Sequence, residues 1–143
     1  MYKTVVVGTD GSPRADKAVD EAIDLAGSEN ARLILVAAFS ANERHWEEIQ
    51  SSAKTERVNL GEVAEQVLAR TAKRAEEKGV SVDYSAYEGD PAEILIEVAD
   101  RENADLIVVG NKGMTGAKRF FLGSVPNKVV HHAPCGVMVV RTD

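Results

Sequence analysis

The chain alternates short apolar runs with longer amphipathic stretches. Four of the runs are nearly continuous in Val, Ile, Leu or Ala, which is typical of strands covered by helices on both faces. The third run instead alternates apolar and polar residues, which favours a strand near a sheet edge. In chain order, the predicted strands are Thr4–Val7, Leu33–Phe39, Val80–Tyr84, Leu106–Val109 and Val137–Val140.

Four amphipathic stretches between these runs predict helices. The first has Ser12 as its N-cap and is expected to end at Gly27, and the second is stopped by Gly79. The third opens with the capping box Asp90–Glu93, and the fourth covers about 124–132.

Strands and helices therefore alternate along the whole chain. This order predicts one α/β domain over residues 1–143, with a parallel sheet and helices on both faces. Such sheets bind ligands at the carboxyl ends of their strands. We expect function to lie in the loops after Val7, Phe39 and Val109. The polar segment 40–61 is expected to be either a surface loop or a flap over the site.

Composition narrows the class of protein. The chain has 143 residues, 17 Lys and Arg against 23 Asp and Glu, and a net charge of −6. An acidic chain is not a generic nucleic-acid binder. Cys135 is the only cysteine, so a cysteine-based metal cluster is excluded. No apolar run approaches the ~20 residues of a membrane span, and the first residues lack the layout of a signal peptide. We expect a cytoplasmic protein with no membrane partner.

The acidic residues are unevenly distributed. None lies between Leu106 and Thr142, where Lys112, Lys118, Arg119, Lys128 and Arg141 occur. This is either chance clustering or the signature of a site for an anion.

The turn after the first strand reads Gly8-Thr9-Asp10-Gly11-Ser12. Its glycines permit a tight turn and the close approach of a ligand. The Asp10 carboxylate is expected either to bond a ribose hydroxyl, to hold a metal ion through water, or simply to organise the turn.

The loop after the fourth strand carries the strongest local signal. Gly110 and Gly113 lie three apart, and Gly123-Ser124 opens the next helix after nine further residues. Glycines let backbone N–H groups approach phosphate oxygens, and a helix N-terminus favours an anion. The spacing is neither that of a Walker A loop nor that of the dinucleotide fingerprint.

With these motifs the chain resembles the universal stress protein family, over essentially its whole length. The resemblance rests on Val7–Ser12, Asp105–Gly110, Leu122–Val125 and Ala133–Cys135. The spacing Gly-x2-Gly-x9-Gly-Ser matches the family's ATP-binding subgroup. The resemblance implies a Rossmann-like fold of the adenine nucleotide alpha hydrolase type, with strand order 3-2-1-4-5.

The resemblance also implies a site and a role. The expected role is that of a non-catalytic, ATP-binding regulator in stress response, with a homodimer formed through the last strand, 136–141. From its position at the strand end, the Asp10 carboxylate is the candidate to hold Mg²⁺. The expected nucleotide-binding residues are Gly8, Thr9, Asp10, Ala37, Val109, Gly110, Asn111, Lys112, Gly113, Gly123, Ser124 and Val125. Asn111 departs from the family, which commonly has Ser or His at this position, but it can still form hydrogen bonds.

Three alternatives to a non-catalytic, ATP-binding regulator remain open. Pro126 stands where many ATP binders have Ser or Thr, and it removes an N–H and a hydroxyl near the phosphates, so AMP or cyclic AMP is an alternative ligand. A slow ATPase or phosphotransferase using the same pocket is the second. A ligand-free interaction module is the third, although the intact glycine spacing speaks against it.

Overall fold

The computed structural model describes residues 1–40, 59–112 and 123–143. Most of the segment expected as a loop or flap, and Gly113, lie outside these residues. The elements in chain order are β1 Thr4–Gly8, α1 Pro13–Glu29, β2 Arg32–Phe39, α3 Leu60–Glu77, β3 Val82–Glu88, α4 Pro91–Arg101, β4 Leu106–Gly110, α5 Ser124–His132 and β5 Gly136–Val140.

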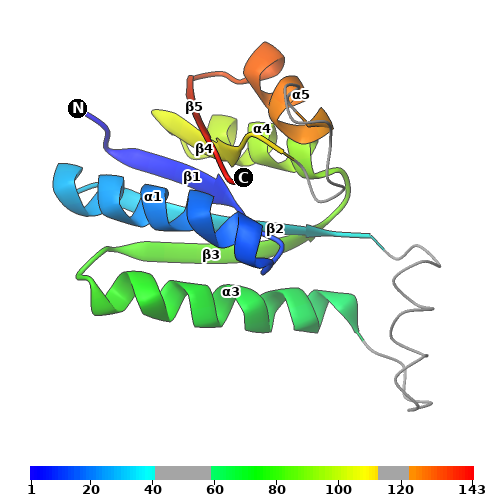
Figure 1. The fold of residues 1–143 in the computed structure, drawn as a ribbon, viewed down its shortest axis with the longest axis horizontal. Coiled ribbons are helices and arrows are strands. Elements are labelled where there is room, and N and C mark those ends of the chain that lie inside the picture. Colours follow the sequence, from blue (N-terminus) through cyan, green and yellow to red (C-terminus); the bar gives the residue numbers. More distant parts are fainter. Residues whose placement is uncertain (41–58, 113–122) are drawn as a thin grey trace.

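The five strands form one parallel sheet in the order β3-β2-β1-β4-β5 (Figure 1), which confirms the predicted fold. After β1 the chain builds toward β2 and β3, and then returns to place β4 on the other side of β1. The strand order therefore reverses between β1 and β4, and this reversal opens a crevice at their carboxyl ends.

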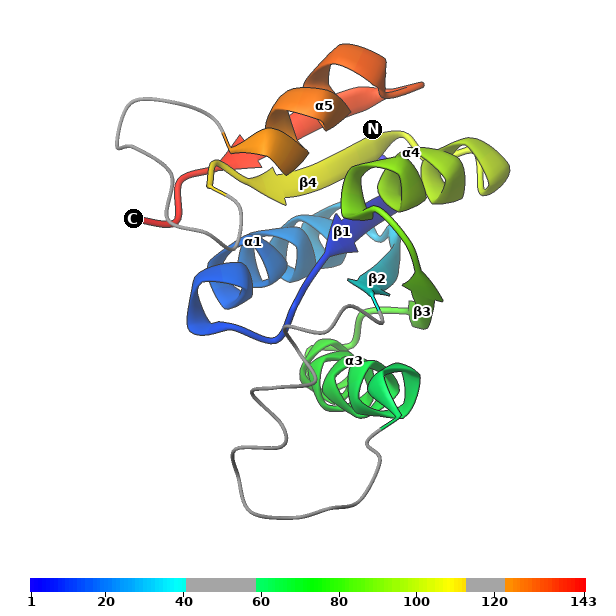
Figure 2. The same cartoon turned by 90° about the vertical axis from the view of Figure 1, so that its right-hand side faces the viewer.

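Helices cover both faces of the sheet because successive side chains on each buried strand point in opposite directions. Val5 and Val7 pack into one core with residues of α1 and α3. Val6 packs into a second core with residues of α4 and α5. In Figure 2 the sheet separates α1 and α3 from α4 and α5.

Side-chain caps begin α1 and α4 where the sequence predicts. The Ser12 hydroxyl accepts a hydrogen bond from the N–H of Ala15, and the Asp90 carboxylate accepts one from the N–H of Glu93. The predicted end of α1 at Gly27 is wrong. The helix continues to Glu29 and ends at Asn30, whose φ of 54° is the left-handed conformation that asparagine tolerates.

The predicted range of the third strand is also wrong, although its position at a sheet edge is confirmed. β3 begins at Val82 and continues to Glu88, which pairs with Phe39 of β2. Backbone pairing with β2 sets the length of β3, so the strand extends through residues that hydrophobicity alone does not mark.

No helix in the described residues is long and apolar enough to cross a lipid bilayer.

Candidate nucleotide-binding site

A cavity of about 760 Å³ opens at the strand-order reversal. That volume lies within the range of small-molecule sites. Its walls come from the carboxyl ends of β1, β2 and β4, from the N-terminal parts of α1, α4 and α5, and from the segment after β5. The lining residues are Gly8, Thr9, Asp10, Ser12, Pro13, Arg14, Ala15, Lys17, Ala18, Val36, Ala38, Pro91, Leu95, Val109, Gly110, Lys112, Val125, Pro126 and Thr142.

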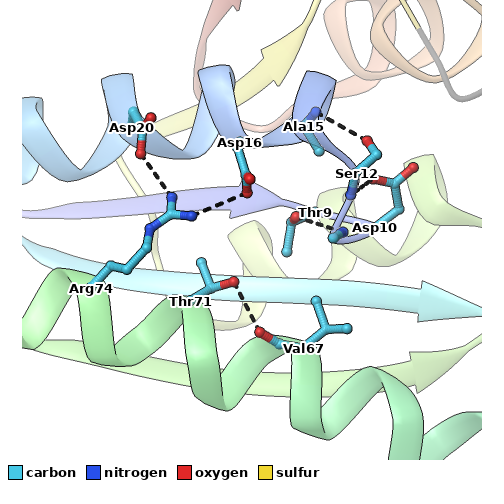
Figure 3. Close-up of polar contacts among 10 residues, drawn as sticks. Thr9, Asp10, Ser12, Ala15, Asp16, Asp20, Val67, Thr71 and Arg74 are labelled. Carbon is cyan, nitrogen blue, oxygen red and sulfur yellow. Dashed lines mark hydrogen bonds and ion pairs between the residues drawn. The ribbon is translucent and has the colours of Figure 1, made fainter.

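The turn after β1 forms one side of the cavity and is fixed by hydrogen bonds (Figure 3). The N–H of buried Thr9 donates to the carbonyl of Val36 at 2.9 Å, and its hydroxyl accepts from the N–H of Gly11 at 3.1 Å. Asp10 is exposed, and its Oδ1 accepts from the N–H of Ser12 at 2.9 Å. Asp10 therefore organises the turn with one oxygen, and no residue of 1–40, 59–112 or 123–143 donates a hydrogen bond to the other.

Helix α3 supports this turn from the side of the first core. A Cβ at Gly11 would lie 2.8 Å from Cγ1 of Val67, so the turn packs directly on α3. Arg74 of α3 pairs with Asp16 at 3.2 Å and with Asp20 at 2.7 Å, which ties α3 to α1 (Figure 3). These contacts hold the start of α1 at the edge of the cavity.

The end of β2 contributes apolar wall through Val36 and Ala38. The predicted residue Ala37 lies between them, is buried, and packs in the core under α1 and α3. Only the two flanking residues are among the lining residues. The alternation of the strand explains this placement, because side chains at 36 and 38 point to the face opposite that of 37.

The end of β4 carries Val109, Gly110 and Lys112 into the cavity wall. Asn111 between them is not a lining residue. Its Oδ1 accepts hydrogen bonds from the N–H and the hydroxyl of Thr142, at 2.9 and 3.1 Å. Asn111 therefore anchors the segment after β5 to the end of β4, a role that the sequence did not indicate.

Lys112 does not extend into solvent, as a lysine in a loop usually does. Its Nζ lies 2.9 Å from Oδ2 of Asp143, and the two side chains are only 9% and 18% exposed. The hydrogen bond from Lys112, together with one from Asn111, lowers the pKa of the Asp143 carboxyl well below its usual range. The charge of Lys112 is thus already matched within the protein.

The start of α5 borders the cavity through Val125 and Pro126. Ser124 is exposed beside them. The N–H of Gly123, expected to face a phosphate, donates to the carbonyl of Asn111 at 2.9 Å. Pro126 has no N–H, so the first turn of α5 presents fewer donors than its position at a helix N-terminus suggests.

Two cations of the wall were missed by the sequence reasoning. Arg14 and Lys17 of α1 line the cavity, and both are exposed. Their spacing of three residues places them on one face of α1, just after the turn that follows β1. That spacing is the sequence signal that could have identified them. With Lys112 they make three cationic side chains against one carboxylate, Asp10, among the lining residues.

Two other side chains with reactive chemistry, those of Cys135 and His131, lie away from the cavity wall. Burial raises the pKa of the Cys135 thiol, which disfavours a reactive thiolate. Within the described ranges, no three His, Cys, Asp or Glu side chains gather as a metal site.

Comparison with known proteins places this geometry in context. The profile of the universal stress protein family matches residues 1–141. The chain is 34% identical over 148 residues to universal stress protein MJ0531 of Methanocaldococcus jannaschii, covering 99% of this chain and 83% of that protein. It is 37% identical over 144 residues to universal stress protein Rv1636 of Mycobacterium tuberculosis, covering 99% and 97% of the two.

Two solved structures are also similar to the chain over nearly its whole length. A universal stress protein in complex with cAMP is 33% identical, with a TM-score of 0.73 and coverage of 99% of this chain and 98% of that one. The hypothetical protein MJ0577 is 28% identical, with a TM-score of 0.81 and coverage of 100% and 98%.

Proposed function

Because the chain belongs to the universal stress protein family, we propose that it binds an adenine nucleotide in the cavity between β1 and β4 and acts as a non-catalytic regulator in a stress response. The observation that carries this proposal is the cavity itself. It combines apolar walls with the exposed cations Arg14 and Lys17 at the point where the strand order reverses. A similar protein of known structure is a complex with cAMP, which supports the same ligand class.

The wall divides into parts that suit the parts of a nucleotide. Val36, Ala38 and Leu95 offer apolar surface to a base, and the other oxygen of Asp10 suits a ribose hydroxyl. Arg14 and Lys17 add positive charge for phosphate. The family resemblance adds Gly113, Gly123, Ser124 and Val125 to the phosphate-binding part, and it assigns Val109 and Gly110 to the ribose and base.

Mg²⁺ fits this site only as a companion of the nucleotide. Asp10 supplies one carboxylate, and one of its oxygens already accepts the N–H of Ser12. Mg²⁺ is commonly held by one or two carboxylates together with substrate phosphates and water. Asp10 would therefore contact a nucleotide-borne ion rather than form a site of its own.

The choice of nucleotide belongs to this proposal as well. ATP is the ligand that the glycine spacing implies. AMP or cyclic AMP is favoured by the proline at 126, by the engaged N–H of Gly123 and by the ion pair of Lys112. The same features weaken the case for an ATPase, because phosphoryl transfer needs charge neutralisation around the transferred group.

We further propose that the chain is a single cytoplasmic domain that forms a homodimer through β5. This strand pairs with β4 along one edge. Its Val139 side chain is 38% exposed, and an apolar edge strand of this kind is usually covered. A second copy meeting it across a two-fold axis would provide that cover.

A thermal-shift experiment tests the binding proposal. At a hundredfold excess over the dissociation constant, a ligand adds about 2.7 kcal/mol, or roughly 5–10 °C for a chain of this size. We expect that shift with AMP, cyclic AMP or ATP. Ala38→Phe, which fills the apolar wall, should abolish it, whereas Ala69→Phe on the exposed face of α3 should not.

Two outcomes would contradict the proposal. A shift with no adenine nucleotide would favour a ligand-free interaction module. Repeated turnovers of phosphate release that are abolished in Asp10→Ala would instead favour an enzyme that uses the same cavity.

A further inference from the structure

The segment Arg141–Asp143, which follows β5, folds against the rim of the cavity. Its central residue, Thr142, is 4% exposed and lines the cavity. Asn111 holds Thr142 by its N–H and its hydroxyl, and a Cβ at Gly110 would lie 3.0 Å from Cγ2 of Thr142. The segment is therefore fixed in place and not a loose tail near the site.

This anchoring sets the side chain of Asp143 against a cation of the cavity wall. Oδ2 accepts from Nζ of Lys112 at 2.9 Å, and Oδ1 accepts from Nδ2 of Asn111 at 3.2 Å. Arg141 adds a longer contact of 3.5 Å from an exposed side chain. Both oxygens of the carboxylate are thus engaged by residues at the end of β4.

A carboxylate in this position opposes the ligand that the cavity is proposed to hold. It cancels the charge that Lys112 would offer to a phosphate, and it repels each further negative charge that approaches. The pair is only slightly exposed, so solvent screens it less than a surface ion pair.

We propose that Asp143 is a specificity-determining residue, which neutralises Lys112 and so tunes the cavity toward adenine nucleotides of low phosphate charge. This inference rests on the proposed function and deepens it. A ligand with one phosphate needs little from Lys112, since Arg14 and Lys17 also line the cavity. A triphosphate must either displace the Asp143 carboxylate or bind beside it.

The test compares Asp143→Asn with the unchanged protein by calorimetric titration with adenosine, cyclic AMP, AMP and ATP. Asparagine keeps the shape of the side chain and an oxygen for Asn111 but removes the charge. We expect the affinity for ATP to rise roughly tenfold, that for AMP to rise less, and that for adenosine to stay unchanged. The gain for ATP should fall as salt is raised from low to molar concentration.

Two further variants separate this effect from others. Asp100→Asn changes the net charge equally, at an exposed position near the far end of α4, and should leave the four affinities unchanged. In Asp143→Asn combined with Lys112→Met, the gain for ATP should disappear, because the cation that Asp143 neutralises is gone.

The results distinguish failure of the inference from failure of the proposed function. Equal changes for adenosine and ATP, no change for either, or a gain that survives Lys112→Met would overturn the role of Asp143 alone. If neither the unchanged protein nor any variant bound an adenine nucleotide, both the inference and the proposed function would be wrong.

Discussion

The substitution Gly11→Ala adds one methyl group to the turn after β1, where the backbone conformation and the contact with α3 both oppose it. The φ of Gly11 is +81°, which an L-residue adopts at a cost of roughly 1–2 kcal/mol. A Cβ there would also lie 2.8 Å from Cγ1 of Val67, and overpacking of this kind costs about 1–3 kcal/mol. Alanine returns about 0.4–1 kcal/mol by restricting the unfolded chain. We therefore expect Gly11→Ala to cost about 2–3 kcal/mol.

Chemical unfolding of a double-mutant cycle separates the two contributions. Val67→Ala removes both methyl groups of the neighbouring side chain, so Gly11→Ala in that background should cost only about 1 kcal/mol for the backbone conformation. In the original background, the midpoint of thermal unfolding should fall by roughly 5–10 °C.

Two results would contradict this strain at Gly11. If Gly11→Ala cost the same in both backgrounds, Val67 would not be the group that limits the turn. If it cost nothing in either, the conformation at Gly11 would not be strained for alanine.

Three further outcomes are expected. Asp105→Asn should cost about 1–2 kcal/mol at pH 7, since the carboxylate accepts two backbone N–H groups at 2.8 and 2.9 Å, which lower its pKa. Because that pKa is depressed, the difference from the unchanged protein should shrink as pH falls below about 4 in urea titrations, and a pH-independent difference would contradict it. Arg14→Gln with Lys17→Gln should weaken AMP binding about tenfold at low salt and less at high salt, whereas unchanged affinity would place the phosphate elsewhere. Val139→Lys should shift the protein toward monomer in sedimentation equilibrium, and an unaltered dimer would exclude β5 as the interface.

Features decided by neighbouring residues were predictable from the sequence. Ser12 and Asp90 cap the helices that follow them because each bond spans only three residues. The continuous apolar character of β1 and β4 predicted strands buried on both faces, and their alternation with helices predicted the parallel sheet. The location of the cavity followed, because a strand-order reversal determines where such sheets open.

Features decided by long-range pairing could not be predicted from the sequence. The contact of Lys112 with Asp143 exists because β5 pairs with β4 up to Gly110 and Val140, which brings residues far apart in the chain to one rim. No local pattern encodes that register. The same pairing gave Asn111 its partner in Thr142, although the sequence suggested a ligand contact for it.

The remaining features that the sequence did not predict concern which residues of a strand or helix face the cavity. The resemblance assigned the backbone of Ala37 to the site, which stays a prediction. The fold turns the Ala37 side chain into the core, while Val36 and Ala38 line the cavity. A strand that is apolar on both faces gives no signal of which residues face the ligand. Arg14 and Lys17 were missed because a lysine or arginine on a helix is usually only solvated.

Occupation of the cavity between β1 and β4 by an adenine nucleotide can be observed residue by residue. The measurement is a titration of the isotopically labelled protein with AMP, followed by the shifts of its backbone amide signals in NMR spectra. We expect saturable shifts at one nucleotide per chain, largest at Gly8, Thr9, Asp10, Val109 and Gly110, with little change along β3 at the sheet edge. Saturable shifts confined to other elements, or none at millimolar AMP, cyclic AMP and ATP, would contradict it.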